Sequence, residues 1–360
     1  MNILYPIIFL LGTLVRSGTA DPCLLFEDGK YYLTMTGSRN VAVISAGSID
    51  SLSSSSHPLK TEDLVYRSEE DGAEVNGTWS PEIHFISETD CPGHSGWYLY
   101  FALRAKHIEN GRVLSDRVRM VALKSASGSP AGPYVHPVGG GISRSQPILD
   151  RDGQPYRNWA CGFSLLRIPS GRHAGLYGMW VEEEGRGKGF GNFFQKIMIA
   201  RMKSPWQMAE LPSEITHPTQ DWEKTGASSR LPMVVEGATA VYGDHGEIFL
   251  IYCGGGYWED YGLGQMTLLR DGNDYADPVR SESWLKFDRN PIFSSSGSPD
   301  VRGAGHAFFF RDADGRRMAC YHAYPVVDGV KGKRRNAYLA PCDIDYSAAE
   351  PSAPYGLLRF

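Results

Sequence analysis

The sequence predicts an all-β protein in which five blades form a β-propeller. Two observations carry this prediction. The 360 residues include 41 glycines, 22 prolines and 19 tyrosines, a composition that suits short strands joined by tight turns. One hairpin pattern also returns along the chain, with further strand-like runs between its copies. Repeats of roughly four strands each are typical of propeller blades.

The repeated pattern is an apolar run, a turn rich in Asp and Gly, and an aromatic-rich run, which together predict a β-hairpin. The copies, in order, are LLFEDGKYYLTMTG from Leu24, HFISETDCPGHSGWYLYFAL from His84, ILDRDGQPYRNWACG from Ile148, AVYGDHGEIFLIYCGG from Ala240 and FFFRDADGRRMACYHAY from Phe308. The strand-like runs between them include RVRMVAL from Arg117, KIMIARM from Lys196 and GQMTLLR from Gly264. A β-sandwich is the alternative, but it does not explain why one hairpin returns so regularly.

Residues 21–360 are predicted to form this single propeller, since no linker or second domain interrupts them. Residues 1–20 form an N-terminal segment that is either a signal peptide or the lead-in to the first blade. The stretch from Ile3 to Val15 is apolar, and Gly18-Thr19-Ala20 resembles a signal-peptidase site. Against this, no early Lys or Arg is present and Pro6 interrupts the run. We expect an extracellular or periplasmic protein, with a cytoplasmic one as the alternative.

The charge balance restricts the partners of the protein. It has 36 basic and 41 acidic residues, a net charge of −5, which argues against a nucleic-acid or anionic-membrane surface. Six cysteines are too sparse for a disulfide scaffold and lack metal-site spacing. Cys161, Cys253 and Cys320 lie in apolar runs and are expected to be buried and unpaired. The sequence carries no signal of oligomeric state.

The starts of the inner strands are where a propeller gathers functional side chains, because equivalent strand starts meet at one face of the axis. The segments just before the five hairpins are Ala20-Asp21-Pro22, Ser80-Pro81-Glu82, Arg144-Ser145-Gln146, Val235-Glu236-Gly237 and Gly305-His306-Ala307. Charged groups at the start of an apolar strand are costly to bury unless they are paired or functional. Their convergence on one funnel therefore indicates acid–base chemistry.

Each of these residues also has a purely structural interpretation. Asp21-Pro22 would serve as a turn opener, Glu236-Gly237 as a loop cap, and His306 as a hydrogen-bonded core histidine. The functional interpretation rests on their common register with the repeat.

With these segments, the sequence resembles glycoside hydrolase family 43 over nearly its whole length. The segment Ala20-Asp21-Pro22 before DGKYYL is similar to the opening segment of that family, and Trp79-Ser80-Pro81-Glu82-Ile83 to its W-(A/S)-P-(D/E)-I motif. RVRMVALKS with Gly132-Pro133-Tyr134, then SPWQM and DWEKTG, match the family's next segments. Val235-Glu236-Gly237 with EIFLIYCGG resembles the segment of the general acid, and Gly303-Ala304-Gly305-His306 the G-x-G-H element. Within the family the chain looks most like exo-acting α-L-arabinofuranosidases.

The resemblance implies an inverting hydrolysis of a pentose-containing glycan, in which Asp21 is the general base and Glu236 the general acid. It also implies that His306 lies on the axis and helps to hold a calcium ion or a water cluster. Inversion needs the two carboxyls roughly 6.5–9.5 Å apart, so that a water fits between base and sugar. Glu236 must stay protonated near neutral pH, which requires burial or a nearby negative charge.

The sequence departs from the family in the third blade. The family places a third acid, an Asp that tunes the general acid, at the start of that blade's inner strand. The matching stretch from Ile142 to Pro147 has no carboxylate, and Ser145, or else Gln146, stands at the expected position. Either the alignment slips and a loop acid serves, or Glu82 compensates, or the protein has lost hydrolysis and keeps a sugar-binding pocket. An inward-pointing Arg144 would add to the problem, because it would lower the pKa of the acid.

Further candidates for contacting the sugar are aromatic residues and one arginine near the same face. Aromatic side chains stack on sugar rings, although in propeller strands they more often belong to the core. Arg335 matches a family position that contacts the sugar. These candidates are Trp79, Trp159, Tyr257, Trp258 and Arg335.

Two functions of different classes therefore remain. The first is an exo-glycosidase that cleaves arabinofuranosyl, or alternatively xylosyl, residues from plant-wall polysaccharide. The second is a non-catalytic glycan-binding propeller with the same fold. Both predict an axial pocket lined by Asp21, Glu82, Glu236 and His306, but the glycosidase additionally requires a group near Glu236 that keeps it protonated.

Overall fold

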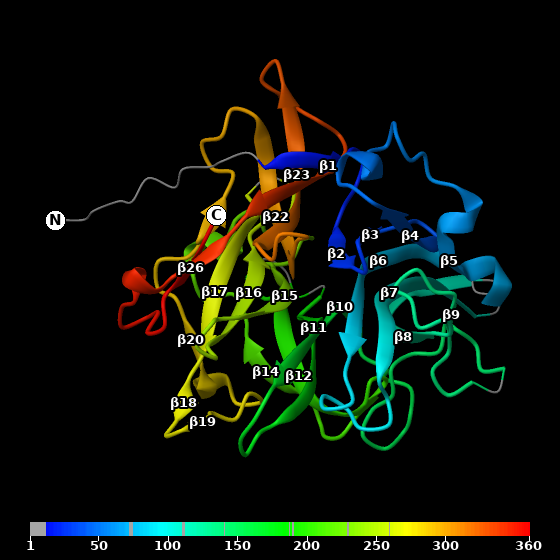
Figure 1. Ribbon diagram of the computed structural model, residues 1–360, viewed down its shortest axis with the longest axis horizontal. Coiled ribbons are helices and arrows are strands. Elements are labelled where there is room, and N and C mark those ends of the chain that lie inside the picture. The colour runs from blue at the N-terminus through cyan, green and yellow to red at the C-terminus, as the bar shows by residue number, and fades with distance from the viewer. Residues whose placement is uncertain are drawn as a thin grey trace.

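Five antiparallel sheets follow one another along the chain and surround a common axis, as the colour sequence in Figure 1 shows. The computed structural model describes residues 12–71, 75–109, 112–139, 141–186, 188, 191–228, 230–258 and 260–360. The predicted five-bladed β-propeller is confirmed.

The first two blades are four-stranded meanders. Blade one contains β2 (Cys23–Glu27), β3 (Lys30–Thr34), β4 (Asn40–Ala46) and β5 (Leu64–Arg67). Blade two contains β6 (Val75–Ile86), β7 (Gly96–Glu109), β8 (Arg112–Ser125) and β9 (Tyr134–Val135). In each, the first strand is the inner one and the last is the outer one.

Blades three and four each carry one additional short strand. Blade three contains β10 (Ala160–Ile168), β11 (Gly175–Glu184), β12 (Phe194–Ser204), β13 (Gln207–Met208) and β14 (Ser213–Thr216). Blade four contains β15 (Val235–Tyr242), β16 (Ile248–Gly254), β17 (Gly262–Leu268), β20 (Trp284–Lys286) and β21 (Phe293–Ser294).

The fifth blade combines strands from the two ends of the described chain. It contains β22 (Val301–Arg311), β23 (Arg317–Val327), β24 (Val330–Lys331), β25 (Asn336–Pro341) and, on its outer edge, β1 (Thr13–Arg16). The blue β1 lies beside the orange and red strands in Figure 1. Its register pairs Thr13 with Leu339 and Leu14 with Tyr338.

Short elements complete the chain outside the blades. Two small hairpins are formed by β18 (Arg270–Asp271) with β19 (Asp274–Tyr275) and by β26 (Asp343–Asp345) with β27 (Leu357–Arg359). The 3-10 helices are η1 (Asp50–Leu52), η2 (Thr61–Asp63), η3 (Ser68–Asp71), η4 (Asp221–Lys224), η5 (Ser281–Ser283) and η6 (Tyr346–Ala348).

The core lies between neighbouring blades. Side chains alternate between the two faces of a strand, so each blade presents apolar residues to both neighbours. Leu25 packs with Leu99 between blades one and two, and Leu24 packs with Cys320 between blades one and five. Similar clusters join blades two and three, three and four, and four and five. All six cysteines are free and buried, as expected for Cys161, Cys253 and Cys320.

The third-blade hairpin predicted from Ile148 is wrong. The segment contains a real turn, since the Gly153 amide donates to the Asp150 carbonyl at 3.1 Å. Pro147 and Pro155 flank it, and a proline cannot donate to a strand ladder. The segment, which connects blades two and three, therefore forms isolated bridges, one between its own residues and the others to β8 and β13. The inner hairpin of blade three is instead β10 with β11.

The N-terminal segment contributes directly to the propeller through β1, and Arg16 is buried. Its guanidinium donates to the carbonyls of Leu52 and His57 at 2.8 and 2.9 Å. A cut after Ala20 would detach β1 from blade five, whereas residues 1–11 lie outside the described part of the chain. Among the described residues, no helix is both long and apolar enough to cross a membrane.

Candidate active site

A pocket of about 880 Å³ opens at one end of the propeller axis. This volume is within the range of small-molecule sites. The pocket gathers most of the residues that the sequence selected, from strands of blades two, four and five and from the segments that connect strands. Those residues are Asp21, Trp79, Trp159, Glu236, Tyr257, Trp258, His306 and Arg335.

Backbone strain marks one position of each inner strand beside the pocket, near the strand start in blades one, three and four and within the long strands β6 and β22 in blades two and five. Asp21, Ser80 and His306 have φ values of 51°, 46° and 52°, a region that non-glycine residues seldom adopt. Gly162 and Gly237 take the same conformation in blades three and four, with φ of 60° at each. Such strain is often found at functional sites. The repeated conformation gives one equivalent position in each blade.

Asp21 is held as a carboxylate by neighbours from two blades. Its Oδ2 accepts a hydrogen bond from the Thr36 hydroxyl at 2.5 Å, and Thr36 in turn accepts one from the Ser80 amide at 2.9 Å. Its Oδ1 lies 3.2 Å from the Arg335 guanidinium. Burial raises the pKa of Asp21, but the positive charge of Arg335, together with the neighbouring imidazoles, outweighs burial and holds it well below its usual range.

Two histidines of blade five complete the surroundings of Asp21. His322 is fully buried, with Nδ1 3.2 Å from Asp21 Oδ1, and burial beside Arg335 lowers its pKa to about 3. His306 Nδ1 lies 3.6 Å from the same oxygen. The two imidazoles stack, with ring centroids 5.8 Å apart. Near neutral pH, His322 is therefore a neutral support for the carboxylate.

Glu236 has the opposite environment. Burial raises its pKa, the charge of Asp21 adds to this effect, and a hydrogen bond from the Tyr261 hydroxyl to Oε1 at 2.7 Å opposes it. The net shift is upward, so Glu236 retains a proton to higher pH than an ordinary glutamate. The pocket thus contains both a carboxyl that holds its proton and one that releases it.

His306 lies between the two carboxyls. A Cβ placed on Gly237, the residue after Glu236, would lie 3.2 Å from both His306 Nδ1 and Cys253 Sγ. This close approach, together with the positive φ, requires a glycine at this position. The backbone of Glu236-Gly237 can therefore pack directly against the imidazole that faces Asp21.

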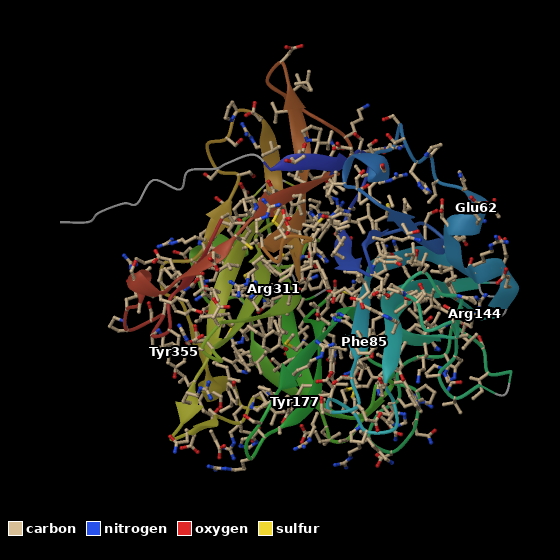
Figure 2. The ribbon with its side chains drawn as sticks, in the orientation of Figure 1. Glu62, Phe85, Arg144, Tyr177, Arg311 and Tyr355 are labelled. Atoms are coloured by element: carbon tan, nitrogen blue, oxygen red, sulfur yellow. The ribbon has the colours of Figure 1, made fainter. Side chains whose placement is uncertain are left out.

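Ser145 does not occupy the third inner-strand start. It lies in the connection before blade three, where its hydroxyl bonds that of Ser143 at 2.8 Å, and it does not line the pocket. Arg144 contacts Glu70 and stacks over Tyr66, 5.5 Å from the ring centroid. Figure 2 shows Arg144 at the outer edge of the molecule. The predicted effect of an inward-pointing arginine therefore does not arise.

The third inner-strand start is Cys161-Gly162, and it carries no carboxylate. The side chain of Cys161 lines the pocket and is buried, which raises the pKa of its thiol well above the usual value. A different carboxylate, Glu183 at the end of β11, reaches the pocket instead. The position of Glu183 depends on pairing between strands, so the sequence alone did not single it out.

Glu82 is buried but does not line the pocket. The register of β6 shifts between Trp79 and Glu82, and this bulge places Ser80, not Glu82, at the axial position. The Oε2 atom of Glu82 lies 2.7 Å from His84 Nε2, and both residues are nearly inaccessible to solvent. Glu82 therefore lies beside His84 and not among the residues that line the pocket, where the sequence predicts it to lie.

The aromatic candidates line the pocket wall. Arg104 lies over the ring of Trp79, 5.3 Å from its centroid, and Arg335 lies 5.7 Å from the centroid of Tyr257. Tyr257 and Trp258 meet edge to face at 4.8 Å. Their rings offer flat apolar surfaces beside polar groups, an arrangement that suits a sugar.

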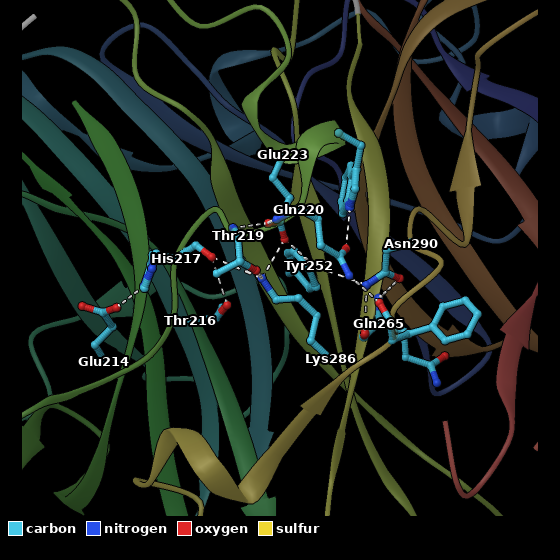
Figure 3. Close-up of polar contacts among 12 residues, drawn as sticks. Glu214, Thr216, His217, Thr219, Gln220, Glu223, Tyr252, Gln265, Lys286 and Asn290 are labelled. Carbon is cyan, nitrogen blue, oxygen red and sulfur yellow. Dashed lines mark hydrogen bonds and ion pairs between the residues drawn. The ribbon is translucent and has the colours of Figure 1, made fainter. Parts of the chain in front are cut away.

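A buried network in blade four supports the Trp258 side of the pocket (Figure 3). Glu223 of η4 is inaccessible to solvent, and its oxygens accept hydrogen bonds from Tyr252 and Lys286 at 2.7 and 2.8 Å. The next turn carries Gly226, where a Cβ would lie 2.9 Å from the Trp258 ring. No role for residues 221–223 could be predicted from the sequence, because a charged helical turn is ordinarily exposed.

The residues around His306 do not fit a calcium ion bound directly by side chains. Calcium takes six to eight oxygen ligands, and the oxygen close to His306 belongs to Asp21, which the Arg335 cation already contacts. In the described ranges, no group of three or more His, Cys, Asp or Glu side chains is arranged to hold a metal. No catalytic step is therefore assigned to calcium.

Comparisons with known proteins agree with the fold. The profile described as "Glycosyl hydrolases family 43" matches residues 172–347. An α-L-arabinofuranosidase from Lactobacillus brevis of known structure superimposes with a TM-score of 0.71 over 97% of this chain and 96% of that one, at 23% identity. A thermostable family-43 glycoside hydrolase superimposes with a TM-score of 0.67 over 97% and 95%, at 19% identity.

Two relatives are similar in sequence. An extracellular exo-α-(1→5)-L-arabinofuranosidase of Streptomyces avermitilis is 25% identical over 309 residues, 84% of this chain and 54% of that protein. An α-L-arabinofuranosidase 43 of Humicola insolens is 26% identical over 316 residues, 86% of this chain and 56% of that protein. The chain thus spans about half the length of these relatives.

The fold and the site define a five-bladed propeller with a pair of contrasting carboxyls on its axis. Together with the sequence matches, they agree with the similarity to glycoside hydrolase family 43 that its motifs predicted.

Proposed function

We propose that this chain is an inverting glycoside hydrolase that removes terminal α-L-arabinofuranosyl residues from plant-wall polysaccharides or oligosaccharides of the arabinan or arabinoxylan type. One observation carries the proposal: a single pocket contains Asp21 with a lowered pKa and Glu236 with a raised one. This separation of two carboxyl pKa values defines a base and an acid. The names of both relatives support the arabinofuranosyl specificity.

In the proposed reaction, ionised Asp21 accepts a proton from a water molecule while the water oxygen attacks the anomeric carbon. The glycosidic carbon–oxygen bond breaks, and Glu236 gives its proton to the leaving oxygen. Asp21 ends protonated and Glu236 ionised, and exchange with solvent restores both. The hydrogen bond from Thr36 and the ion pair with Arg335 fix the position of the Asp21 carboxylate in the pocket.

The test is hydrolysis of an aryl α-L-arabinofuranoside, with an aryl β-D-xyloside beside it to examine β-xylosidase activity as the alternative. Asp21→Asn and Glu236→Gln should each lower kcat by at least about a hundredfold, in line with the usual contribution of general acid–base catalysis. Asp221→Asn, which alters an exposed carboxylate, should leave turnover unchanged. Proton NMR of the first-released anomer examines inversion: retention of configuration would contradict the assigned roles.

A non-catalytic glycan-binding propeller is the second candidate, and Cys161 at the third inner-strand start favours it. In that case calorimetry would detect binding of arabino-oligosaccharides with no product over long incubation. Glu236→Gln would then change affinity alone. Any turnover that is lost in both carboxyl variants contradicts this candidate.

We further propose an extracellular or periplasmic location, supported by the extracellular relative from Streptomyces avermitilis. Fractionation of the producing cells, followed by N-terminal sequencing of the purified protein, examines this directly. Recovery of the protein in the cytoplasmic fraction would contradict it.

A further inference from the structure

Blade three presents a carboxylate to the pocket from its second strand. Cys161 of β10 pairs with Val181 of β11, and directly paired residues lie on the same face of a sheet. Side chains alternate along a strand, so Glu183 lies on the same face as Val181. Cys161, at the position that lacks a carboxylate, and Glu183, near the end of β11, therefore lie on the same face of the sheet.

At Met179 that face is directed toward blade four, while Cys161 and Val181, nearer the pocket, also cluster with Ala102 and Val118 of blade two. Met179, two positions from Val181 on β11, packs with Val235 of β15 in the core between the two blades. Val235 immediately precedes Glu236, and β11 contacts β15. A Cβ on Gly162 would lie 4.0 Å from the Gly237 amide nitrogen, so the two inner strands are also adjacent here. Glu183 thus lines the same pocket as Glu236.

Glu183 is built into this position. Its side chain is 9% exposed, and it is bound by the Nε and a terminal nitrogen of Arg186, a residue that is itself 67% exposed. On the neighbouring strand β12, Gln195 lies opposite it in register and lines the same pocket. Burial raises the pKa of Glu183, Arg186 lowers it, and the charge of Glu236 raises it. The net shift of the Glu183 pKa is upward, and the interaction between the two carboxyls acts on Glu183, whereas burial and the charge of Asp21 raise the pKa of Glu236.

The charged and titratable groups around Glu236 come from every element that packs against it. Blade four supplies Cys253, Tyr257 and Tyr261, and blade five supplies His306 and Arg335; Asp21 precedes blade one, and blade three supplies Cys161 and Glu183. Arg335 already forms an ion pair with Asp21. Like Asp21, Glu183 is a carboxylate with its own cation, and the Arg186 cation favours its ionised form against the upward effect of burial on its pKa.

We propose that Glu183 replaces the missing third acid from β11, holding a negative charge near Glu236 that keeps the general acid protonated, while Arg186 sets how strongly that charge acts. This inference rests on the proposed function, since it assigns Glu183 a positioning role toward the general acid. Glu183 itself forms no bond to the sugar and transfers no proton. Cys161 fills the vacated inner-strand position as a small apolar side chain.

The test compares the pH dependence of kcat/KM for three variants. The alkaline limb of this profile reports the pKa of the acid in the free enzyme. Glu183→Gln should move that limb down by about 0.5–1 pH unit, because a like charge is removed. Arg186→Gln should move it up, because the charge of Glu183 is no longer neutralised. Glu184→Gln is the matched control, since this adjacent, exposed carboxylate pairs with Lys196 on the other face of β11.

A relocation variant separates this role from a merely structural one. Cys161→Asp in the Glu183→Gln background puts a carboxylate back on the inner strand. It should return the alkaline limb toward its original position and recover most of the lost kcat. At a pH above the pKa of the acid, each unit of pKa corresponds to about tenfold in its protonated fraction, so Glu183→Gln should lose up to about tenfold in kcat with KM little changed.

Three results would overturn the proposal. The first is a loss of activity in Glu183→Gln without a shift of the alkaline limb, and the second is a rise in KM alone, which would make Glu183 a sugar contact. The third is a shift in the same direction for Glu183→Gln and Arg186→Gln. Infrared titration of the carboxyl stretch, taken as the difference from Glu236→Gln, measures the same coupling without substrate. An enzyme with no turnover would therefore refute the proposed function, while the infrared shift would still decide the role of Glu183.

Discussion

Replacing Glu223 by glutamine is expected to destabilise blade four by about 3–5 kcal/mol, the usual cost of removing one partner of a buried ion pair. Oε2 accepts the amides of Thr219 and Gln220 at 2.6 and 2.8 Å, and Oε1 accepts Tyr252 and Lys286. Whichever way a glutamine amide turns, its NH2 group meets two donors. Two hydrogen bonds to a charged group are then lost, at about 1.5–3 kcal/mol each.

The assay is equilibrium urea unfolding together with calorimetry. The unfolding entropy of about 2.1 cal/mol/K per residue gives roughly 0.76 kcal/mol/K for 360 residues, so the midpoint should fall by about 4–7 °C. Asp221→Asn, in the same 3-10 helix but exposed, should change stability by less than about 0.5 kcal/mol. If Glu223→Gln were as stable as Asp221→Asn, the reasoning about the buried network would be refuted.

Three further predictions concern the active site. The pH profile of kcat/KM should be broad. The lowered pKa of Asp21 extends the acidic limb to lower pH, and the raised pKa of Glu236 extends the alkaline limb to higher pH. A narrow profile with limbs at ordinary carboxyl values would contradict both assignments. His322 has a pKa of about 3 in the folded protein against 6.5 in the unfolded chain. Its contribution to the free energy of unfolding is therefore complete above pH 6.5 and should be lost as the pH falls. His322→Gln should flatten this pH dependence of the melting temperature. Thr36→Val removes the hydrogen bond to Asp21 and should lower kcat by about ten- to a hundredfold with little effect on KM, whereas a larger effect on KM would indicate a misshapen pocket.

The fold could be predicted because its signals are local. Each of four predicted hairpins joins a turn rich in Asp and Gly to strand runs long enough to pair, and the inner strand of each begins beside an Asp, Glu or His. Asp21, Glu236 and His306 reach the axis for this reason. The copy from Ile148 has the same turn but is flanked by prolines, so its ladder cannot form. The true inner hairpin of blade three, β10 with β11, lies further along the chain, and the predicted alignment therefore put Ser145 at the third inner-strand start.

The remaining parts of the site depend on pairing that no single segment encodes. Glu82 is displaced from the axis by a bulge at Ser80, and the WSPEI motif does not reveal which residue takes the positive φ. Glu183 comes from a run of three glutamates, and only the register with Cys161 and the packing on blade four distinguish it from Glu184. Thr36 contributes a hydroxyl from a loop that follows an ordinary strand.

The pairing of β1 with β25 has a consequence for how the ring is made. During synthesis, β1 (Thr13–Arg16) leaves the ribosome before the other described strands, while its partner β25 (Asn336–Pro341) emerges more than three hundred residues later. The edge of β1 must remain without its partner through nearly the whole of this interval, and an unpaired strand edge is prone to associate with other chains. Closure of the fifth blade is therefore among the last long-range contacts to form, and it ties β1 to the blade that supplies His306 and His322.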